Sequence, residues 1–349
     1  MNKIRKKTEL ITEYIIENIE NNQKDLVSNV ANKFNISRQA VSRRIAKLIE
    51  QNIIIHEKGS RQYKLYLKEE FSQSFVITKD IQEDVIWRSY IRSHIGNIPE
   101  NAVNIWQHGF SEIFNNVIDH SESKEVYVNI KKTIYSIEMI ITDKGIGIFN
   151  KIKQKMNLLD ERHAVLELTK GKLTTDPISH SGEGIFFTSR VFDTFCILSG
   201  GVFLMHTNNE DGDWILETQE NSIGTLVQMK LRNNTNRTLK EVFDKFSPPE
   251  SYGFTKTIVP VKLAQYGDEK LVSRSQARRL LERVDRFKTV ILDFTGVETI
   301  GQAFADQVFR VFASEHPQIQ ILEMRANEEV KQMINRVTSN ISSEQVELF

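Results

Sequence analysis

The sequence predicts a multi-domain α/β protein built from three successive domains, over residues 1–70, 71–240 and 250–349. Three observations lead to this prediction. The chain of 349 residues is longer than the roughly 150 residues typical of one domain. Its periodic segments change character twice, from helices followed by two strands, to a helix followed mainly by strands, to alternating strands and helices. The pair Pro248-Pro249 predicts a linker before the last group.

The composition is that of a globular protein whose domains can each bury a core. Hydrophobic residues make up 40% and charged residues 26% of the chain, with 16 Gly and only 6 Pro. No run approaches the ~18 apolar residues of a membrane span, and the first residues lack the apolar segment of a secretion signal. We therefore expect a cytoplasmic protein without membrane association. The single cysteine, Cys196, excludes a disulfide within one chain, and its apolar neighbours predict a buried thiol.

Basic residues are concentrated in the first domain. Residues 1–70 contain 14 Lys and Arg residues against 9 Asp and Glu residues, a net charge of +5, whereas the remaining residues carry −5. The formal net charge of zero argues against bulk coating of nucleic acid, but its uneven distribution favours a basic surface near the N-terminus.

The first domain has the pattern of three helices followed by a hairpin. Residues 4–20 and 26–34 repeat apolar side chains at helical spacing. Ser37 is a suitable N-cap for a third helix. Two strand-like runs, 53–55 and 63–67, follow and are separated by a basic turn that contains glycine. The apolar positions of the third helix share one face and are Val41, Ile45, Leu48 and Ile49.

Residues 29–65 resemble the winged-helix DNA-binding domains of bacterial regulators. The resemblance implies that the third helix enters the major groove of double-stranded DNA, where Arg and Gln read base edges, while cations of the wing contact phosphate. A homodimer would suit the paired half-sites that such domains commonly read. The alternative is an ordinary solvated helix face on a domain that contacts protein. The predicted DNA-binding residues are Ser37, Arg38, Gln39, Ser42, Arg43, Lys47, Lys58 and Arg61.

Residues 106–120 predict an amphipathic helix that carries polar groups suited to metal and phosphate chemistry. Glu112, Asn116 and His120 recur every four residues and therefore share one face. An amide oxygen can bind Mg²⁺ while a carboxylate one turn away aligns and deprotonates a nucleophile. Glu-x-x-x-Asn occurs often by chance, so the pattern needs support from elsewhere in the domain.

Two glycine motifs supply that support. Strand-like runs over 125–130 and 135–141 precede Asp143-Lys144-Gly145-Ile146-Gly147, in which a carboxylate at a strand end can meet a ligand and glycines allow close approach of a planar base. A polar, lid-like loop is expected over 150–180. Ser181-Gly182-Glu183-Gly184 then opens a predicted helix over 185–195, where free N–H groups can face phosphate. The remaining strand candidates are 202–206, 214–218 and 225–231.

This order of elements, over about residues 105–232, resembles the GHKL nucleotide-binding fold, the α/β sandwich of gyrase, heat-shock chaperones, histidine kinases and mismatch-repair ATPases. The resemblance implies ATP and Mg²⁺ as cofactors. Glu112 would be the general base, Asn116 would bind Mg²⁺, and Asp143 would accept from the adenine amino group. The other predicted ATP-binding residues are Gly145 and Gly147 near the base, Gly182 and Gly184 at the phosphates, Thr225 in the adenine pocket, and His120 on the helix face of Glu112 and Asn116.

The second glycine motif departs from the usual small-residue version because it contains Glu183. Conventional histidine kinase activity is not expected, since the upstream histidines His94 and His108 lack the neighbours of a phosphoacceptor. With Glu112 present, the motif spacing is closer to that of anti-sigma-factor serine kinases.

The third domain alternates strands over 257–263, 290–294 and 319–324 with helices near 280–284 and over 304–312, which predicts a small α/β domain. The run VILDFTGVETIGQAFADQVFRVF resembles the STAS domain of anti-sigma-factor antagonists, which are substrates of GHKL serine kinases.

The residues that stand at the phosphorylation position of these antagonists differ from the family pattern. Ile300-Gly301-Gln302 occupies the place of the phosphorylatable serine, and Thr299 is the nearest hydroxyl. Thr299 is either a modification site or a helix cap.

The three predictions together describe an ATP-binding regulatory protein, in which a nucleotide switch with Mg-dependent ATP hydrolysis controls DNA binding and the interaction of the STAS-like domain with a protein partner. One alternative is a protein serine/threonine kinase, or an ATPase acting on a partner, with the winged helix as a docking module. A scaffold with a degenerate site is the third possibility, against which the intact Glu112, Asn116 and Asp143 argue.

Overall fold

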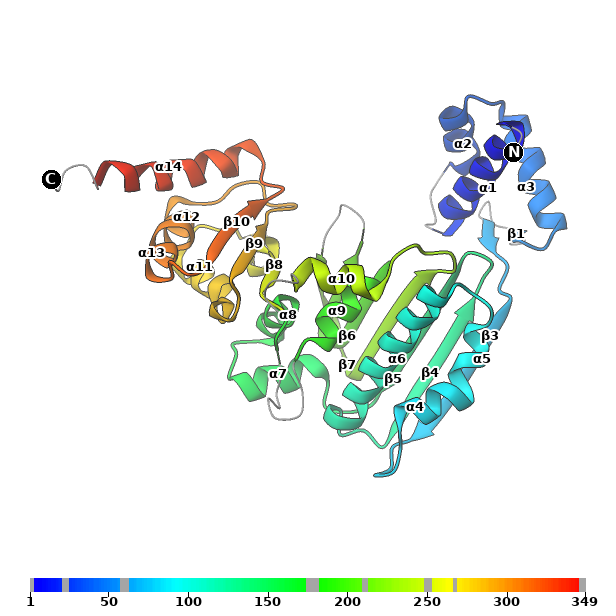
Figure 1. Cartoon of the computed structure of the whole chain (residues 1–349), viewed down its shortest axis with the longest axis horizontal. Coiled ribbons are helices and arrows are strands. Elements are labelled where there is room, and N and C mark those ends of the chain that lie inside the picture. The colour runs from blue at the N-terminus through cyan, green and yellow to red at the C-terminus, as the bar shows by residue number, and fades with distance from the viewer. Residues whose placement is uncertain are drawn as a thin grey trace.

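The computed structural model describes residues 3–20, 25–56, 63–173, 182–208, 213–247, 253–265 and 269–344. It is a mixed α/β protein of several domains, with three clusters of buried apolar residues along the chain. Figure 1 shows the N-terminal domain in blue and the C-terminal domain in yellow to red on either side of a central sheet. Among the described residues, no helix is both long and apolar enough to cross a membrane.

The N-terminal domain contains the elements that the sequence predicts. Helices α1 (Lys3–Glu20), α2 (Leu26–Phe34) and α3 (Arg38–Glu50) precede an antiparallel pair, β1 (Ile54–His56) and β2 (Tyr63–Leu65). Ser37 caps α3 because its hydroxyl accepts from the N–H of Ala40. The buried faces of these helices pack together in one small core, which includes Ile15, Val30, Val41 and Ile45.

The central sheet begins directly after this domain. Residues 66–68 connect β2 to β3 (Glu69–Val76), which pairs antiparallel with β4 (Glu125–Lys132) along the sheet edge. The predicted boundary at residue 70 therefore falls inside β3.

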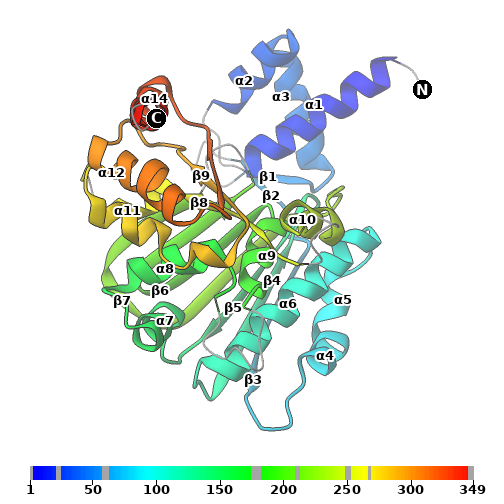
Figure 2. The same ribbon diagram turned by 60° about the vertical axis from the view of Figure 1, so that its left-hand side comes forward.

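Five antiparallel strands form the central sheet, in the order β3-β4-β5-β7-β6. The other members are β5 (Ser136–Asp143), β6 (Thr194–Thr207) and β7 (Asp213–Arg232). Helix α6 (Glu100–His120) lies across one face of the sheet, as Figures 1 and 2 show, because its apolar residues belong to the same core as those of β4 and β5.

Shorter helices complete the layer beside α6. Residues 83–95 form α4 (Glu83–Ile86), a π-helical turn (Trp87–Ile91) and α5 (Arg92–Ile95), and α10 (Leu239–Phe246) follows β7. Trp87 and Ile91 are buried against the sheet core.

The expectation of a lid-like loop over 150–180 is wrong for the part of it that the structure describes. That part contains α7 (Ile148–Met156) and α8 (Glu161–Lys170), and every residue from 163 to 170 is buried. Helix α8 shows no apolar period in the sequence because it is buried on several sides and carries polar residues in its interior contacts. Residues 174–181 lie outside the described residues.

Two further element predictions differ from the structure. The helix expected over 185–195 is α9 (Gly184–Val191), because the apolar residues that follow it start β6 at Thr194. The three strand candidates after it belong to only two long strands, β6 and β7, whose pairing shifts register at Gly200.

The C-terminal domain has a three-stranded parallel sheet in the order β10-β9-β8. Its strands are β8 (Lys256–Pro260), β9 (Thr289–Asp293) and β10 (Gln320–Met324), and a 3₁₀ turn (Val261–Ala264) replaces the end of the predicted first strand. The helices are α11 (Arg274–Leu281), α12 (Gln302–Asp306) with a π-helical continuation (Gln307–Phe312), α13 (Ala313–Glu315) and α14 (Glu328–Glu344). The predicted linker prolines, 248 and 249, lie outside the described residues.

The central and C-terminal domains share buried apolar residues. Leu166 of α8, Phe186 and Phe187 of α9, and Phe246 of α10 belong to the same cluster as the C-terminal core. Because these residues are buried together with the C-terminal core, the contact between the two domains is a continuation of that core.

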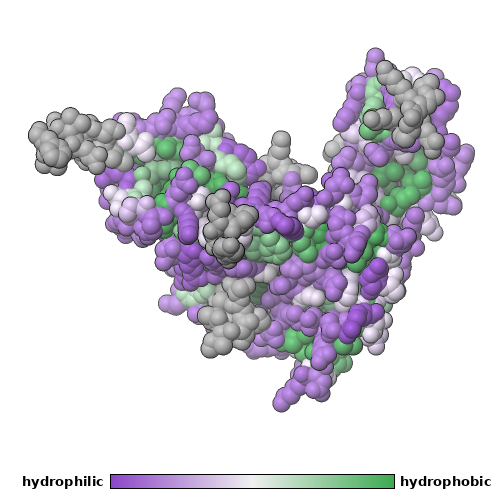
Figure 3. Space-filling view, in the orientation of Figure 1, coloured by the Kyte–Doolittle hydropathy of each residue, from purple (hydrophilic) through white to green (hydrophobic). Residues whose placement is uncertain are grey.

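The outer surface has a different character. On the face in Figure 3 most described side chains are hydrophilic, and the hydrophobic ones occur in separate smaller areas.

Candidate functional site

Most of the residues predicted to bind nucleotide line one cavity of about 300 Å³. It opens between α6, the end of β5, β7 and the segments around α7 and α9. Its volume is at the lower end of the range of small-molecule pockets. The predicted residues that line it are Glu112, Asn116, His120, Asp143, Gly147, Gly182, Gly184 and Thr225.

Helix α6 places three of these side chains. Phe110 and Phe114 are fully buried on the sheet side of the helix, which turns the four-residue series Glu112, Asn116 and His120 toward the cavity. The sequence therefore folds the predicted metal-binding amide and the carboxylate onto one wall.

Asp143 ends β5 as a carboxylate that is only 3% exposed. Its Oδ1 atom accepts a hydrogen bond of 2.7 Å from the N–H of Gly145, and the N–H of Thr225 also donates to the carboxylate. Burial raises the pKa of Asp143, while these two backbone donors partly oppose the shift. Among the described residues no Lys, Arg or His forms an ion pair with Asp143, so a donor from a ligand would find an acceptor there.

Gly145 does not line the cavity, but it holds the turn after β5 against α6. A Cβ atom at this position would overlap the carbonyl oxygen of Ser121, and the next residue, Ile146, donates its N–H to that oxygen at 2.8 Å. Gly224, with φ +77°, makes a similarly close approach to the backbone of Asp143. Both glycines therefore fix where the Asp143 carboxylate lies.

Gly184 brings the N-terminus of α9 against the predicted general base. A Cβ atom at Gly184 would overlap Oε2 of Glu112, so the carboxylate fills the space that a side chain would need. Glu183, the acidic departure from the usual glycine motif, is not among the residues that line the cavity. Burial raises the pKa of Glu183, and Lys172 nearby opposes that shift.

Lys151 is a cavity residue that the sequence reasoning missed. Its Nζ atom donates to the carbonyl oxygen of His120 at 2.6 Å, and its side chain is 14% exposed. Of the described residues that line the cavity, it is the one Lys or Arg. It lies on α7, inside the stretch expected to be a loop, so its position could not be deduced. A cation here favours an anionic ligand.

The predicted DNA-binding residues of the N-terminal domain are gathered on α3 and its cap. Arg44, the next arginine of α3, points inward and donates to the carbonyl oxygen of Thr8 at 2.6 Å and to the hydroxyl of Thr12 at 3.0 Å. It therefore ties α3 to α1. Lys58 and Arg61, predicted on the wing, lie outside the described residues. The exposed members of the set are Ser37, Arg38, Gln39, Ser42, Arg43 and Lys47.

Comparison with known families concerns the third domain. Residues 276–331 match the family described as STAS-like domain of unknown function (DUF4325). The C-terminal domain is STAS-like. The match runs from α11 through β9 and β10 into the start of α14, and it confirms the prediction for this part of the chain. No curated protein matches the sequence.

In the STAS-like domain, Thr299 lies near the N-terminal end of α11. Its neighbour Ile300 pairs with Leu271 just before that helix, and a Cβ atom at Gly301 would lie 2.8 Å from Cα of Val272. The contact with α8 is at the opposite end of α11, where the carbonyl groups of Arg279 and Glu282 meet Lys170.

Proposed function

We propose that the chain is an ATP-binding regulatory protein, in which a GHKL-like nucleotide site controls DNA binding by the N-terminal domain and partner binding by the STAS-like domain. The observation that carries this proposal is the meeting of Glu112 and Asn116 with Asp143 in a single cavity. Asn116 lies on a helix and Asp143 ends a strand 27 residues later in the sequence, yet both side chains line the same cavity.

The residues present fit adenosine triphosphate with Mg²⁺. Asp143 offers a buried acceptor for the adenine amino group, and Asn116 offers an amide oxygen, a kind of ligand that Mg²⁺ prefers. The backbone at Gly182 and Gly184 and the Lys151 ammonium suit phosphate oxygens. Bound Mg-ATP supplies a γ-phosphoryl group open to attack by water or a hydroxyl.

Glu112 is the candidate group for accepting a proton during that attack. Its carboxylate lies at the cavity wall beside Gly184, where it can orient a nucleophile and take its proton. Hydrolysis would then reset the switch, provided that the two nucleotide states differ in their affinity for DNA or for a partner.

Two measurements, calorimetric titration and an assay of phosphate release, test the nucleotide site. Calorimetry with Mg-ATP should show binding to the wild type and to Glu112→Gln, and phosphate release should be lost in Glu112→Gln. The substitution keeps the size of the side chain and removes its basicity. Absence of Mg-ATP binding to the wild-type protein would refute the proposal.

DNA binding is supported by the exposed face of α3. Arg43 and Lys47 are one turn apart and exposed, and an arginine on a helix of this kind can reach base edges or phosphates. We expect Arg43→Ala with Lys47→Ala to weaken binding to genomic DNA fragments and to lower the slope of log K against log salt by about 2. The matched control removes two exposed cations of the central domain, Arg88 and Lys240. Equal salt slopes for both double variants would exclude α3 as the DNA-contacting surface.

A protein kinase remains the second candidate, because a STAS-like domain resembling known kinase substrates is part of the same chain. Thr299 is an unsuitable acceptor of the phosphoryl group in this arrangement. It lies near the N-terminal end of α11, whereas α8 contacts the C-terminal end of that helix. Incubation with γ-labelled ATP separates the two functions. Label transfer to a co-purifying protein would favour the kinase, and release of free phosphate alone would favour the switch.

A further inference from the structure

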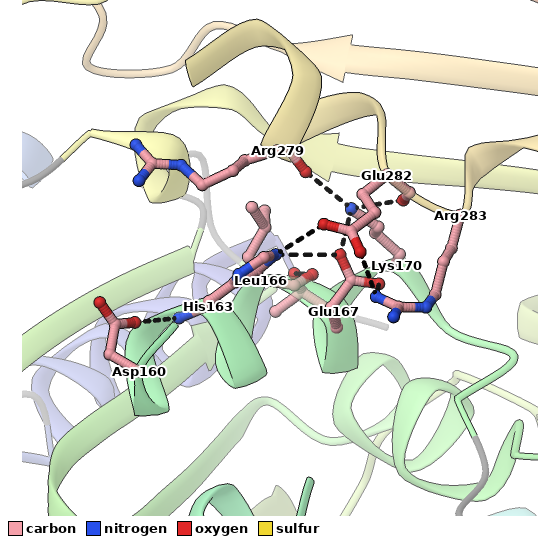
Figure 4. Close-up of polar contacts among 9 residues, drawn as sticks. Asp160, His163, Leu166, Glu167, Lys170, Arg279, Glu282 and Arg283 are labelled. Carbon is pink, nitrogen blue, oxygen red and sulfur yellow. Dashed lines mark hydrogen bonds and ion pairs between the residues drawn. The ribbon is translucent and has the colours of Figure 1, made fainter. Parts of the chain in front are cut away.

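A buried polar cluster joins α8 of the central domain to α11 of the STAS-like domain. Figure 4 shows His163, Glu167 and Lys170 on α8 facing Glu282 and Arg283, which follow α11. The side chains of Glu167 and Lys170 are 1% and 2% exposed. Charges buried to this extent persist only when they are paired and hydrogen-bonded, so the cluster fixes how the two helices meet.

Lys170 is the centre of the cluster. Its Nζ atom donates to Oε1 of Glu167 at 2.6 Å, to the carbonyl oxygen of Glu282 at 2.7 Å and to that of Arg279 at 3.2 Å. All three donor positions of the ammonium are therefore satisfied, and two of the acceptors are carbonyl groups at the C-terminal end of α11. A cation is favourable at that end of a helix.

A metal ion does not explain the cluster. His163, Glu167 and Glu282 bring possible ligand atoms within 4.8 Å of one another. Both oxygens of Glu167 already face cations, since Lys170 is 2.6 Å from one and Arg283 is 3.3 Å from the other. Two carboxylates and two cations balance each other while His163 is neutral, and burial lowers the pKa of His163 in that direction.

The segment that follows Lys170 connects the cluster to the cavity. The hydroxyl of Thr257 donates to the carbonyl oxygen of Lys170 at 2.7 Å, and Arg286 donates to that of Lys172 at 2.8 Å. The next residue, Leu173, lines the cavity, and its N–H donates to the carbonyl oxygen of Gly182 at 3.0 Å. A continuous set of contacts thus runs from the STAS-like sheet to the glycine motif.

Helix α8 also divides its apolar side chains between the two domains. Leu166 packs in the C-terminal cluster, whereas Val165 and Leu168 pack in the central one, and Leu168 lines the cavity. A shift of α8 would therefore change a wall of the cavity and the seat of the STAS-like domain together.

We propose that the STAS-like domain regulates the nucleotide cavity by holding α8 in place, with Lys170 as the positioning residue. Displacement of the domain, for example by a protein partner, releases α8 and weakens ligand binding. By linkage, a ligand in the cavity tightens the docking of the STAS-like domain to the same extent. This inference rests on the proposed nucleotide function and adds to it the direction of control.

The test compares Mg-ATP binding to full-length wild type and Lys170→Met by calorimetry. Methionine keeps an unbranched side chain as far as the ε position and removes the ammonium. We expect the Kd to rise roughly 5- to 150-fold, the usual range for coupled sites. The matched control is Lys240→Met, which removes a lysine of α10 that is 81% exposed and paired with Asp244; its Kd should stay at the wild-type value. An unchanged Kd in folded Lys170→Met overturns the inference.

A second variant serves if Lys170→Met does not fold. Glu282→Gln removes the pairs with His163 and Arg283 from a side chain that is 39% exposed, and it leaves the carbonyl that accepts from Lys170. A raised Kd in this variant supports the inference, and a wild-type Kd overturns it.

Hydrogen exchange supplies a readout that a purely structural role would not move. In the wild type, Mg-ATP should slow hydrogen exchange in α11 as well as around the cavity. In whichever of the two variants is folded, Mg-ATP should slow exchange around the cavity alone. Binding of Mg-ATP without any change in α11 of the wild type contradicts the coupling alone. Failure of the wild type to bind Mg-ATP contradicts the proposed function instead, so the two failures are distinguishable.

Discussion

Replacement of Asp143 by Asn should separate ligand recognition from folding. The carboxylate is 3% exposed and accepts from the N–H groups of Gly145 and Thr225. An amide of the same shape has one acceptor oxygen, so its NH₂ group must face a backbone donor or the amino group of the ligand. A hydrogen bond to a charged partner is worth about 1.5–3 kcal/mol, which corresponds to a rise in Kd for Mg-ATP of roughly 10- to 150-fold.

The same substitution should lower the free energy of unfolding of the ligand-free protein by less than it lowers the magnitude of the free energy of Mg-ATP binding. Burial raises the pKa of Asp143 in the folded state above its unfolded value, so the folded state binds a proton in a pH interval where the unfolded state does not. The contribution of Asp143 to the free energy of unfolding therefore falls as the pH rises through that interval, which begins near pH 4. Asp143→Asn has no such slope.

Calorimetric titration and thermal melting between pH 4 and neutral pH measure both effects. Glu138→Gln is the matched control, because Glu138 is on the same strand and accepts from Gln228 at 2.8 Å, away from the cavity. Tight Mg-ATP binding by Asp143→Asn, equal to that of the wild type, would refute the role given to the carboxylate. A wild-type pH slope in Asp143→Asn would refute the electrostatic reasoning.

Three further substitutions or treatments test the packing around the site. Gly184→Ala should displace the Glu112 carboxylate and reduce phosphate release with little loss of melting temperature, because the atom it would meet ends a flexible side chain. Gly145→Ala should instead cost about 1–3 kcal/mol of unfolding free energy, since its Cβ would meet the backbone of Ser121, and urea unfolding measures this loss. Burial raises the pKa of Cys196 to about 12, so iodoacetamide at pH 8 should label the thiol only after unfolding; labelling of the native protein would contradict this burial.

The sequence predicted those parts of the site that lie on strongly periodic or glycine-marked elements. Glu112, Asn116 and His120 could be placed on one face because α6 is amphipathic along its length. Asp143 could be placed at a strand end because the turn after it needs glycine at Gly145. Local pattern and tertiary position agree in both cases.

Helix α8 and Lys151 could not be predicted for a physical reason. A helix that is buried by two domains at once has no single apolar face, and Glu167 and Lys170 read as solvent-exposed in a sequence although they neutralise each other in the interior. Lys151 acquires its position from its bond to the carbonyl of His120, which is a contact between elements that no local pattern encodes. These failed predictions therefore lie on α7 and α8, where side-chain positions depend on contacts between elements that are distant in the sequence.

The junction at β3 has a consequence for any shortened form of the chain. A protein that begins at residue 71 lacks Glu69 and Glu70, which pair with Lys132 and Lys131 at one end of the sheet edge. Removal of all of β3 would leave β4 as an open edge, with its row of N–H and C=O groups free to pair with β4 of another molecule. In the intact chain these groups of β4 pair with β3, so the strand that directly continues the N-terminal domain is also needed to complete the central sheet.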